Sequence, residues 1–233
     1  MRIAVYSDIH GNTPGLQAVH RKIDSLGSID LEIFLGDAVY GGPGVSDVVQ
    51  FLQGRNATIL RGNHDEGLVD FERVLPKLPA AHQHAAQVWH DWILPQLSPE
   101  DLSFLAHAPL THRETLPNGS EILFCHAAPN DTVVMLLGPD APAQNGERVF
   151  PGVDSDILCT GHWHEHVFLN WGALQVVCAG GVGLSPDGFS RWLLIEADQH
   201  TIRFAPQLTP YDTDEFRRLA AESNMPSILH PGA

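Results

Sequence analysis

The stretch RIAVYSDIH, residues 2–10, decides the expected fold, because an apolar run leads directly into a carboxylate and an imidazole. We predict that residues 2–7 form a short buried strand that carries Asp8 and His10 at its carboxyl end. A helix capped by Thr13 is expected next, since apolar residues recur behind Thr13 with helical spacing. Strand, polar loop and helix in this order are typical of the start of a βαβ unit.

Two further apolar runs end in the same kind of polar loop. Residues 31–35 precede the pair GD at 36–37, and residues 57–60 precede RGNHD at 61–65. The repetition of strand, polar loop and helix predicts a mostly parallel sheet with helices packed against it. Because ligands bind at the carboxyl ends of the strands in such sheets, we expect the three loops to meet at one site.

The remainder of the chain has a different pattern. Residues 66–109 are predicted to be helical and contain no candidate ligand, so we expect a helical insertion or lid there. Short apolar runs follow, which are typical of a second, largely antiparallel sheet. The expected fold is an α/β sandwich of two sheets between helices (α/β/β/α), with one domain over residues 1–205 and a C-terminal helix and tail over residues 206–233. The strands expected in the second sheet are residues 121–125, 156–159, 167–171, 174–178, 191–197 and 201–204.

Length and charge narrow the classes of function. A chain of 233 residues with 43% hydrophobic residues fits one large globular domain. Lys and Arg total 13 against 28 Asp and Glu, a formal net charge of −15, so binding to long nucleic acid is not expected. A small anionic substrate remains compatible, because bound divalent cations create a local positive field. We expect no signal peptide and no membrane span, and we expect Cys125, Cys159 and Cys178 to be buried thiols, which together predict a cytoplasmic protein.

The polar loops contain carboxylate, carboxamide and imidazole groups, and the second half of the chain adds further histidines. This set needs no thiolate, which favours manganese, iron, cobalt, nickel or catalytic zinc over structural zinc. Two divalent ions held close together need a shared anion, and Asp37 in the central loop is the candidate. The candidate metal ligands are Asp8, His10, Asp37, Asn63, His126, His162 and His164.

The order of these residues resembles the calcineurin-like metallophosphoesterase superfamily over roughly residues 1–205, through the motifs Asp8-x-His10, Gly36-Asp37-x3-Gly41, Gly62-Asn63-His64-Asp65, His126 and Gly161-His162-x-His164. The resemblance implies two divalent metal ions, with manganese the first expectation. One ion would be bound by Asp8, His10, Asp37 and His164, and the other by Asp37, Asn63, His126 and His162. The resemblance also implies hydrolysis of a phosphoester or phosphoanhydride by a hydroxide that both metals share. His64 would protonate the leaving oxygen, with Asp65 nearby to orient it.

Within that superfamily the chain is most similar to bacterial phosphodiesterase-like members, including symmetric dinucleoside tetraphosphate hydrolases. This similarity implies a small, nucleotide-like phosphorylated substrate, and Arg61 and Tyr40 are further candidates for contact with it. The protein phosphatases of the superfamily carry an Asp-Arg pair where this chain has Tyr40-Gly41, so that activity is disfavoured. Two alternatives stay open: a phosphomonoesterase that acts on small phosphates or nucleotides, and a non-catalytic binding scaffold of the same fold.

Overall fold

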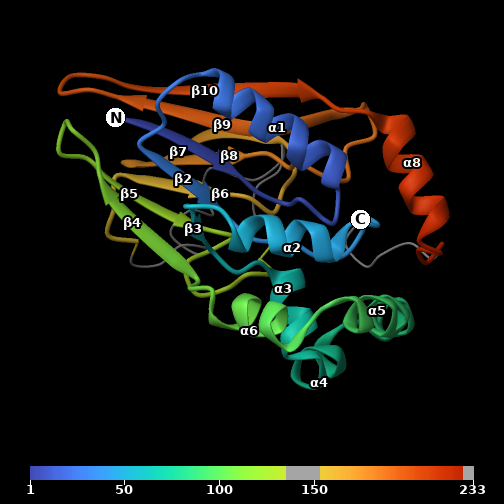
Figure 1. The fold of residues 1–233 in the computed structure, drawn as a ribbon. Helices are drawn as coiled ribbons and strands as arrows, with labels where there is room; N and C mark the ends of the chain where they lie inside the picture. The colour runs from blue at the N-terminus through green and yellow to red at the C-terminus, as the bar shows by residue number, and fades with distance from the viewer. Residues whose placement is uncertain (135–152, 228–233) are drawn as a thin grey trace.

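The N-terminal strand lies at the centre of the first of two five-stranded sheets, whose strand order is β10-β9-β1-β2-β3 (Figure 1). The computed structural model describes residues 1–134 and 153–227. β1 pairs in parallel with β2, and β2 pairs in parallel with β3, as the βαβ pattern predicts. The strands of this sheet are β1 (Arg2–Tyr6), β2 (Leu31–Phe34), β3 (Thr58–Ile59), β9 (Phe189–Ala197) and β10 (Ile202–Pro210).

The prediction that β9 and β10 belong to the second sheet is wrong. β9 pairs antiparallel with β1, opposing Arg2 with Glu196, and β10 pairs antiparallel with β9. Residues 192–195 of β9 are buried without alternation, which is the pattern of a strand covered on both faces. The sequence of β9 therefore indicates a central strand, but it does not indicate in which sheet that strand lies.

The second sheet has the order β4-β5-β6-β8-β7 and is mixed, not largely antiparallel as we predicted. β5, β6 and β8 run parallel at its centre, and β4 and β7 are antiparallel edges. A long connection joins β5 to β6, and only a long connection permits a parallel crossover. Its strands are β4 (Thr111–Thr115), which the sequence analysis missed, β5 (Glu121–Cys125), β6 (Ile157–Thr160), β7 (His166–Trp171) and β8 (Leu174–Ala179).

One hydrophobic core lies between the two sheets. β1 shows the reason in its alternation: Ile3 and Val5 point between the sheets, while Ala4 and Tyr6 belong to the core on the other face. The side chains between the sheets include Ile3, Val5, Ile33, Leu193, Ile195, Ile122, Phe124, Ile157, Cys159 and Val177. Burial of these strands on both faces fixes where their carboxyl ends, and the loops beyond them, lie.

Helices α1 (Thr13–Ser25) and α2 (Val45–Gln53) cover the other face of the first sheet (Figure 1). The N-cap of α1 is Asn12, and not Thr13 as predicted, because the Asn12 carboxamide oxygen accepts the Gly15 N–H at 3.0 Å. Two sheets flanked by helices confirm the expected fold class.

The predicted helical stretch forms a separate group of helices beside the β3 edge of the first sheet (Figure 1). α6 begins with the expected capping box, in which Asp101 and Ser98 cap each other's backbone N–H. The division of the chain at residue 205 and the role of these helices as a lid stay predictions. The helices are α3 (Asn63–Val69), α4 (Phe71–Val74), η1 (Leu75–Lys77), α5 (Ala80–Ile93), η2 (Leu94–Gln96) and α6 (Pro99–His107).

The last described element, α8 (Thr213–Glu222), contacts α1 and matches the helix expected near the C-terminus. In residues 1–134 and 153–227, no helix combines the length and the apolar character that crossing a bilayer requires.

Candidate metal centre

The predicted ligands come from loops at the carboxyl ends of strands in both sheets, where open α/β folds bind their ligands. All of them belong to two neighbouring groups of side chains, which share the Asp37 carboxylate. They lie in the β1–α1 loop (Asp8, His10), in the β2–α2 loop (Asp37), at the start of α3 (Asn63), directly after β5 (His126) and between β6 and β7 (His162, His164).

The backbone of these loops is strained. A left-handed conformation costs a non-glycine residue about 1–2 kcal/mol, so it persists only where the surroundings impose it. Here the loops hold one another, since the Asp8 N–H donates to the Gly36 carbonyl at 2.9 Å and the His10 N–H donates to the Asp37 carbonyl at 3.1 Å. Such strain concentrated at one place indicates a functional site. The φ angles are 54° for Asp8, 50° for His10, 64° for Asp37, 66° for His162 and 64° for His164.

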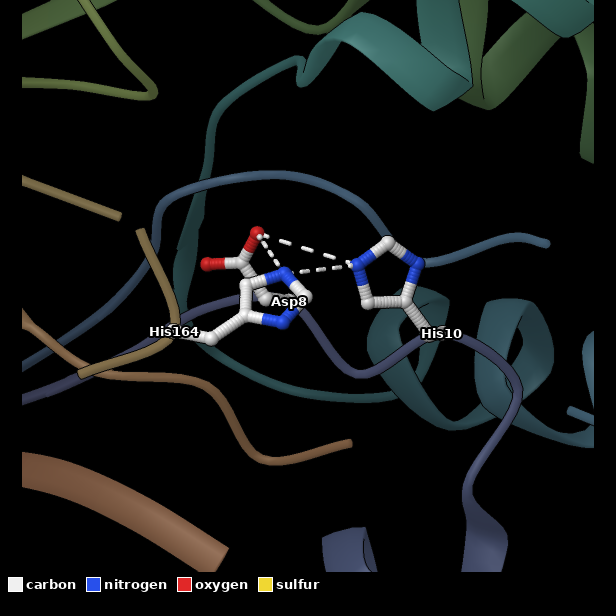
Figure 2. Close-up of side chains that lie close together, drawn as sticks. All are labelled: Asp8, His10 and His164. Carbon is white, nitrogen blue, oxygen red and sulfur yellow. Dashed lines mark hydrogen bonds and ion pairs between the residues drawn. The ribbon is translucent and has the colours of Figure 1, made fainter. Parts of the chain in front are cut away.

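The first group consists of Asp8, His10 and His164, whose side chains point toward one another (Figure 2). The two Nε2 atoms are 3.1 Å apart, and Asp8 Oδ1 lies 3.3 Å from His164 Nε2 and 3.8 Å from His10 Nε2. Ligands bound about 2.1 Å from one ion lie about 3.0–3.4 Å from each other. Two of the three distances match ligands of a single cation, and the 3.8 Å between Asp8 Oδ1 and His10 Nε2 is wider than that range.

The protonation of His10 supports the same conclusion. Its Nδ1 lies 3.2 Å from the Val39 carbonyl, which can only accept, so Nδ1 carries the proton and Nε2 presents a lone pair. Burial, and next the neighbouring His164, lower the pKa of His10 to about 3. Asp8 Oδ1 is buried, and among the described residues it has no hydrogen-bond donor, only the His164 Nε2 atom at 3.3 Å. A lone pair and an unsatisfied carboxylate oxygen that face one point are the environment that a cation needs.

The second group consists of Asp37, His126 and His162, with Asn63 beside them. His126 Nε2 lies 3.3 Å from Asp37 Oδ2 and 3.2 Å from His162 Nδ1. The Asn63 carboxamide oxygen faces acceptors, at 2.9 Å from His126 Nε2 and 3.0 Å from His162 Nδ1. These close contacts between acceptor atoms are resolved in either of two ways: the Asn63 amide is rotated so that its NH2 group donates to the histidines, or a cation lies among the acceptors.

His126 is held in the tautomer that a metal requires. Its Nδ1 donates to the Leu35 carbonyl at 3.0 Å, which leaves Nε2 toward Asp37 and Asn63. Burial lowers the pKa of His126, but the Asp37 carboxylate outweighs burial and raises the pKa to about 9. A proton and a metal ion therefore compete for the same Nε2 lone pair.

Asp37 connects the two groups through one atom. Its Oδ2 lies 3.3 Å from His126 Nε2 and 3.8 Å from His10 Nε2, while its Oδ1 accepts the His64 N–H at 2.8 Å. Burial raises the pKa of Asp37, but His126 and the other nearby histidines lower it further, so that the net pKa is well below its usual value. Asp37 is thus an anion placed between two groups of ligands, the position that a bridging carboxylate requires.

Asp65 supports this arrangement from behind. Its carboxylate accepts the N–H groups of Asp37 at 2.8 Å, of Ala38 at 2.9 Å and of Gly62 at 3.0 Å. Asp65 is 1% exposed and does not belong to the cavity lining described below. Asp65 thus holds the backbone of the Asp37 loop, and its predicted role in orienting His64 stays a prediction.

The predicted acid, His64, lies on the first turn of α3 beside both groups. Its Nε2 is 3.8 Å from Asp37 Oδ2, and its ring packs edge-on to His10 with centroids 5.1 Å apart. The ring of Tyr40 lies 5.4 Å from that of His64. Both side chains line a cavity that reaches the metal ligands.

That cavity has a volume of about 360 Å³. Part of the lining, formed by the apolar residues at 71, 74, 75 and 78, was not predicted from the sequence. These residues nevertheless follow helical spacing, a few residues after the RGNHD loop. Arg61 is not among the described lining residues, and its guanidinium donates to the Ala106 carbonyl at 3.0 Å, so substrate contact by Arg61 stays a prediction without support. The lining consists of Asp37, Tyr40, Asn63, His64, Gly67, Phe71, Val74, Leu75, Leu78, Pro79, His82, Ala86, Val133, His162 and His164.

The fold and this site define a metal-dependent phosphate-ester hydrolase of the two-sheet α/β type. The chain belongs to the calcineurin-like phosphoesterase family, whose profile matches residues 1–166. An uncharacterized protein of Methanocaldococcus jannaschii is 25% identical over 248 residues, covering 97% of this chain and 95% of that protein.

Solved structures share the fold. A hypothetical protein from Pyrococcus horikoshii OT3 superposes with a TM-score of 0.80 at 22% identity, covering 100% of this chain and 98% of that one. A metallophosphoesterase from Sphaerobacter thermophilus superposes with a TM-score of 0.76 at 21% identity, covering 97% and 95%. The whole described chain, including β9, β10 and the helices after β3, therefore has counterparts in known folds.

Proposed function

We propose that the chain is a two-metal phosphoesterase that hydrolyses phosphodiester or phosphoanhydride bonds of small substrates. The observation that carries the proposal is the position of Asp37 Oδ2 between two groups of buried ligands. Asp8, His10, Asp37 and His164 would hold one ion, and Asp37, Asn63, His126 and His162 would hold the other. Imidazole, carboxylate and carboxamide ligands suit manganese, iron, zinc, cobalt or nickel, and the family makes manganese our first expectation.

Divalent ions bound there would polarise the phosphate and lower the pKa of an attacking water. The contribution of the protein is to fix the ligands before substrate arrives. Val39 and Leu35 carbonyls set the tautomers of His10 and His126, so that their Nε2 atoms are ready to bind. The Asp65 carboxylate holds Asp37 in place through backbone N–H groups.

His64 is our candidate for the proton donor to the leaving oxygen. Its imidazole lines the cavity beside the metal ligands, and its backbone N–H is fixed by Asp37 Oδ1 at 2.8 Å. A proton on the imidazole would pass to the leaving oxygen as the phosphorus–oxygen bond breaks. Asp65 then acts as a positioning residue for Asp37 through the backbone of its loop.

Family membership supports a phosphorylated substrate, and the small cavity favours a small molecule. A phosphoesterase from E. coli, Yfce, has the same fold with a TM-score of 0.52 at 18% identity. The net charge of −15 opposes binding to long nucleic acid. Three buried cysteines without a disulfide support a reducing compartment, so we propose the cytoplasm as its location.

The proposal is tested by metal analysis and by substitution of Asp37. The purified protein is expected to contain divalent metal, and manganese is expected to support turnover in a panel of phosphomonoesters, phosphodiesters and dinucleoside polyphosphates. Asp37→Asn removes the bridging charge, so turnover and metal content should fall while the protein stays folded. Asp154→Asn, a matched change at an exposed position, is the control. Wild-type rates in Asp37→Asn would refute the bridging role, and a protein that binds no divalent metal would support a scaffold.

A further inference from the structure

The cavity that reaches the metal ligands has two chemically different ends. At the inner end lie the polar side chains of Asp37, Asn63, His64, His162 and His164. The lining from α4, η1 and α5 is mainly apolar and consists of Phe71, Val74, Leu75, Leu78, Pro79 and Ala86, with the imidazole of His82 among them, and Val133 adds a further apolar side chain. A substrate that places its phosphate at the inner end therefore extends over an apolar wall.

These apolar side chains, called the apolar wall below, are more exposed than the side chains of an ordinary hydrophobic core. Val74, Leu75 and Leu78 are only half-buried, and Val133 is 59% exposed. Phe71, in contrast, is buried and stacked on His90 with ring centroids 3.8 Å apart, so the wall has a fixed backing. Apolar side chains that face an open cavity next to a polar site are typical of a ligand pocket.

The charges around the cavity oppose a polyphosphate. The described lining contains no lysine or arginine. Arg73, on the same helical segment, is paired with Glu66 and Asp70, and Arg61 donates to the Ala106 carbonyl. Among the described lining residues, an extra phosphate beyond the metal site would therefore meet apolar carbon and the His82 imidazole, and no lysine or arginine to bind it.

We propose that this wall binds the apolar organic group of the substrate, so that the substrate class is a phosphate ester of an aryl or medium-chain alkyl alcohol. The inference rests on the proposed function, because the metal site must hold the phosphate. It departs from the nucleotide-like substrate expected from the sequence and favours a smaller organic group, since a cavity of about 360 Å³ is near the lower end of about 300–1,000 Å³ for small-molecule sites.

Binding of alkylphosphonates tests the inference independently of turnover. A phosphonate presents its anionic group to the metals, and its carbon–phosphorus bond is not cleaved by hydrolysis of an ester. We would measure the Kd of methylphosphonate, butylphosphonate and hexylphosphonate for the manganese-loaded protein by calorimetry. Each methylene that becomes buried contributes about fourfold in affinity, equivalent to about 0.8 kcal/mol, so hexylphosphonate should bind at least about tenfold more tightly than methylphosphonate.

Variants locate the effect on the wall. In Leu78→Ser, the ratio of the methylphosphonate and hexylphosphonate Kd values should fall about threefold or more, because a serine removes the apolar contact at one position of the wall. Leu75→Ser makes the same test at a second position of the wall. Leu94→Ser is the matched control: Leu94 is 38% exposed at the start of η2 and is absent from the cavity lining, so the ratio should not change.

The outcomes separate the two proposals. Chain-length dependence that Leu78→Ser weakens supports binding of an apolar group by the wall. Equal binding of the three phosphonates, no binding of any, or an equal change of the ratio in Leu94→Ser, overturns it. Tighter binding of a non-hydrolysable adenosine phosphonate than of hexylphosphonate also overturns it, in favour of a nucleotide. Absence of hydrolysis across methyl, hexyl and aryl phosphodiesters and across dinucleoside polyphosphates refutes the proposed function, while the phosphonate Kd values still decide whether the wall binds an apolar group.

Discussion

Replacement of Gly62 by alanine should disable the metal site while leaving the rest of the fold in place. A Cβ atom at position 62 would lie 2.1 Å from Asp37 Oδ1 and 2.4 Å from the Asp37 backbone nitrogen. The Asp37 loop therefore leaves no room for a side chain at position 62. The Gly62 N–H also donates to Asp65 Oδ2 at 3.0 Å, which holds Gly62 in this position. Either the Asp37 carboxylate or the start of α3 must move.

The size of the effect follows from that overlap. Relief of a 2.1 Å contact requires a displacement of about 1 Å, since carbon and oxygen atoms in packed interiors stay more than about 3 Å apart. Overpacking of this kind costs about 1–3 kcal/mol of stability. A misplacement of about 1 Å at catalytic groups costs about 100-fold in rate. We therefore expect turnover to fall about 100-fold, and bound metal to fall, with a smaller loss of the free energy of unfolding.

Three measurements on one preparation test this prediction: initial rates with manganese on an aryl phosphodiester, metal content by elemental analysis, and urea unfolding. Gly54→Ala is the matched control, because its Cβ would lie 3.6 Å from the Gln50 carbonyl oxygen, an ordinary contact. If Gly62→Ala keeps a rate and a metal content within about threefold of Gly54→Ala, against the roughly 100-fold expected, the close approach of the two loops does not control the site.

Other consequences can be measured separately. Asp65→Asn replaces a carboxylate that accepts three backbone N–H groups. This variant should lose about 1–3 kcal/mol of the free energy of unfolding, and its kcat should fall by a larger factor than its KM changes. An unchanged kcat would exclude a positioning role for Asp65. His20 is buried against Tyr6 and Phe51, and burial, with Arg55 next, lowers its pKa to about 4. Between about pH 6.5 and pH 4, the His20 imidazole binds a proton in the unfolded chain but not in the folded chain. The free energy of unfolding therefore falls as the pH drops through this range, by about 2 kcal/mol between pH 7 and pH 5. His20→Leu should flatten that part of the urea-unfolding pH profile, and an unchanged profile would contradict the assignment. Removal of metal by a chelator should lower the melting temperature, since a ligand present at 100 times its Kd stabilises the folded protein by about 2.7 kcal/mol. Added manganese should restore the melting temperature. A melting temperature that does not change would argue against a structured metal site.

The candidate ligands could be named from the sequence because each follows a strand-forming run. Asp8 and His10 follow β1, Asp37 follows β2 and His126 follows β5 directly, so local pattern was sufficient to find them. The role of Asp65 could not be found in this way. Its neighbour in sequence, His64, suggested an orienting role, which stays a prediction. The carboxylate of Asp65 accepts the N–H of Asp37, a contact between residues 28 apart.

The apolar cavity wall was also missed, although its residues were visible as a helical pattern. Apolar residues spaced at 71, 74, 75 and 78 predict a helix face, but the pattern does not say what covers that face. Only the position of α4 and η1 beside the metal ligands shows that part of it faces a cavity.

The sequence by itself determined the strands, most of the helices and the chemistry of the ligands, because alternation, capping and residue type act over a few neighbours. The tertiary structure alone decided that β9 and β10 join the first sheet beside β1, and that β5, β6 and β8 run parallel. Sheet membership depends on which buried strands meet across long connections, and apolar strands of similar composition can pair in several orders. The distance of Asp37 Oδ2 from both histidine groups likewise follows from the packing of the two sheets, which no local pattern encodes.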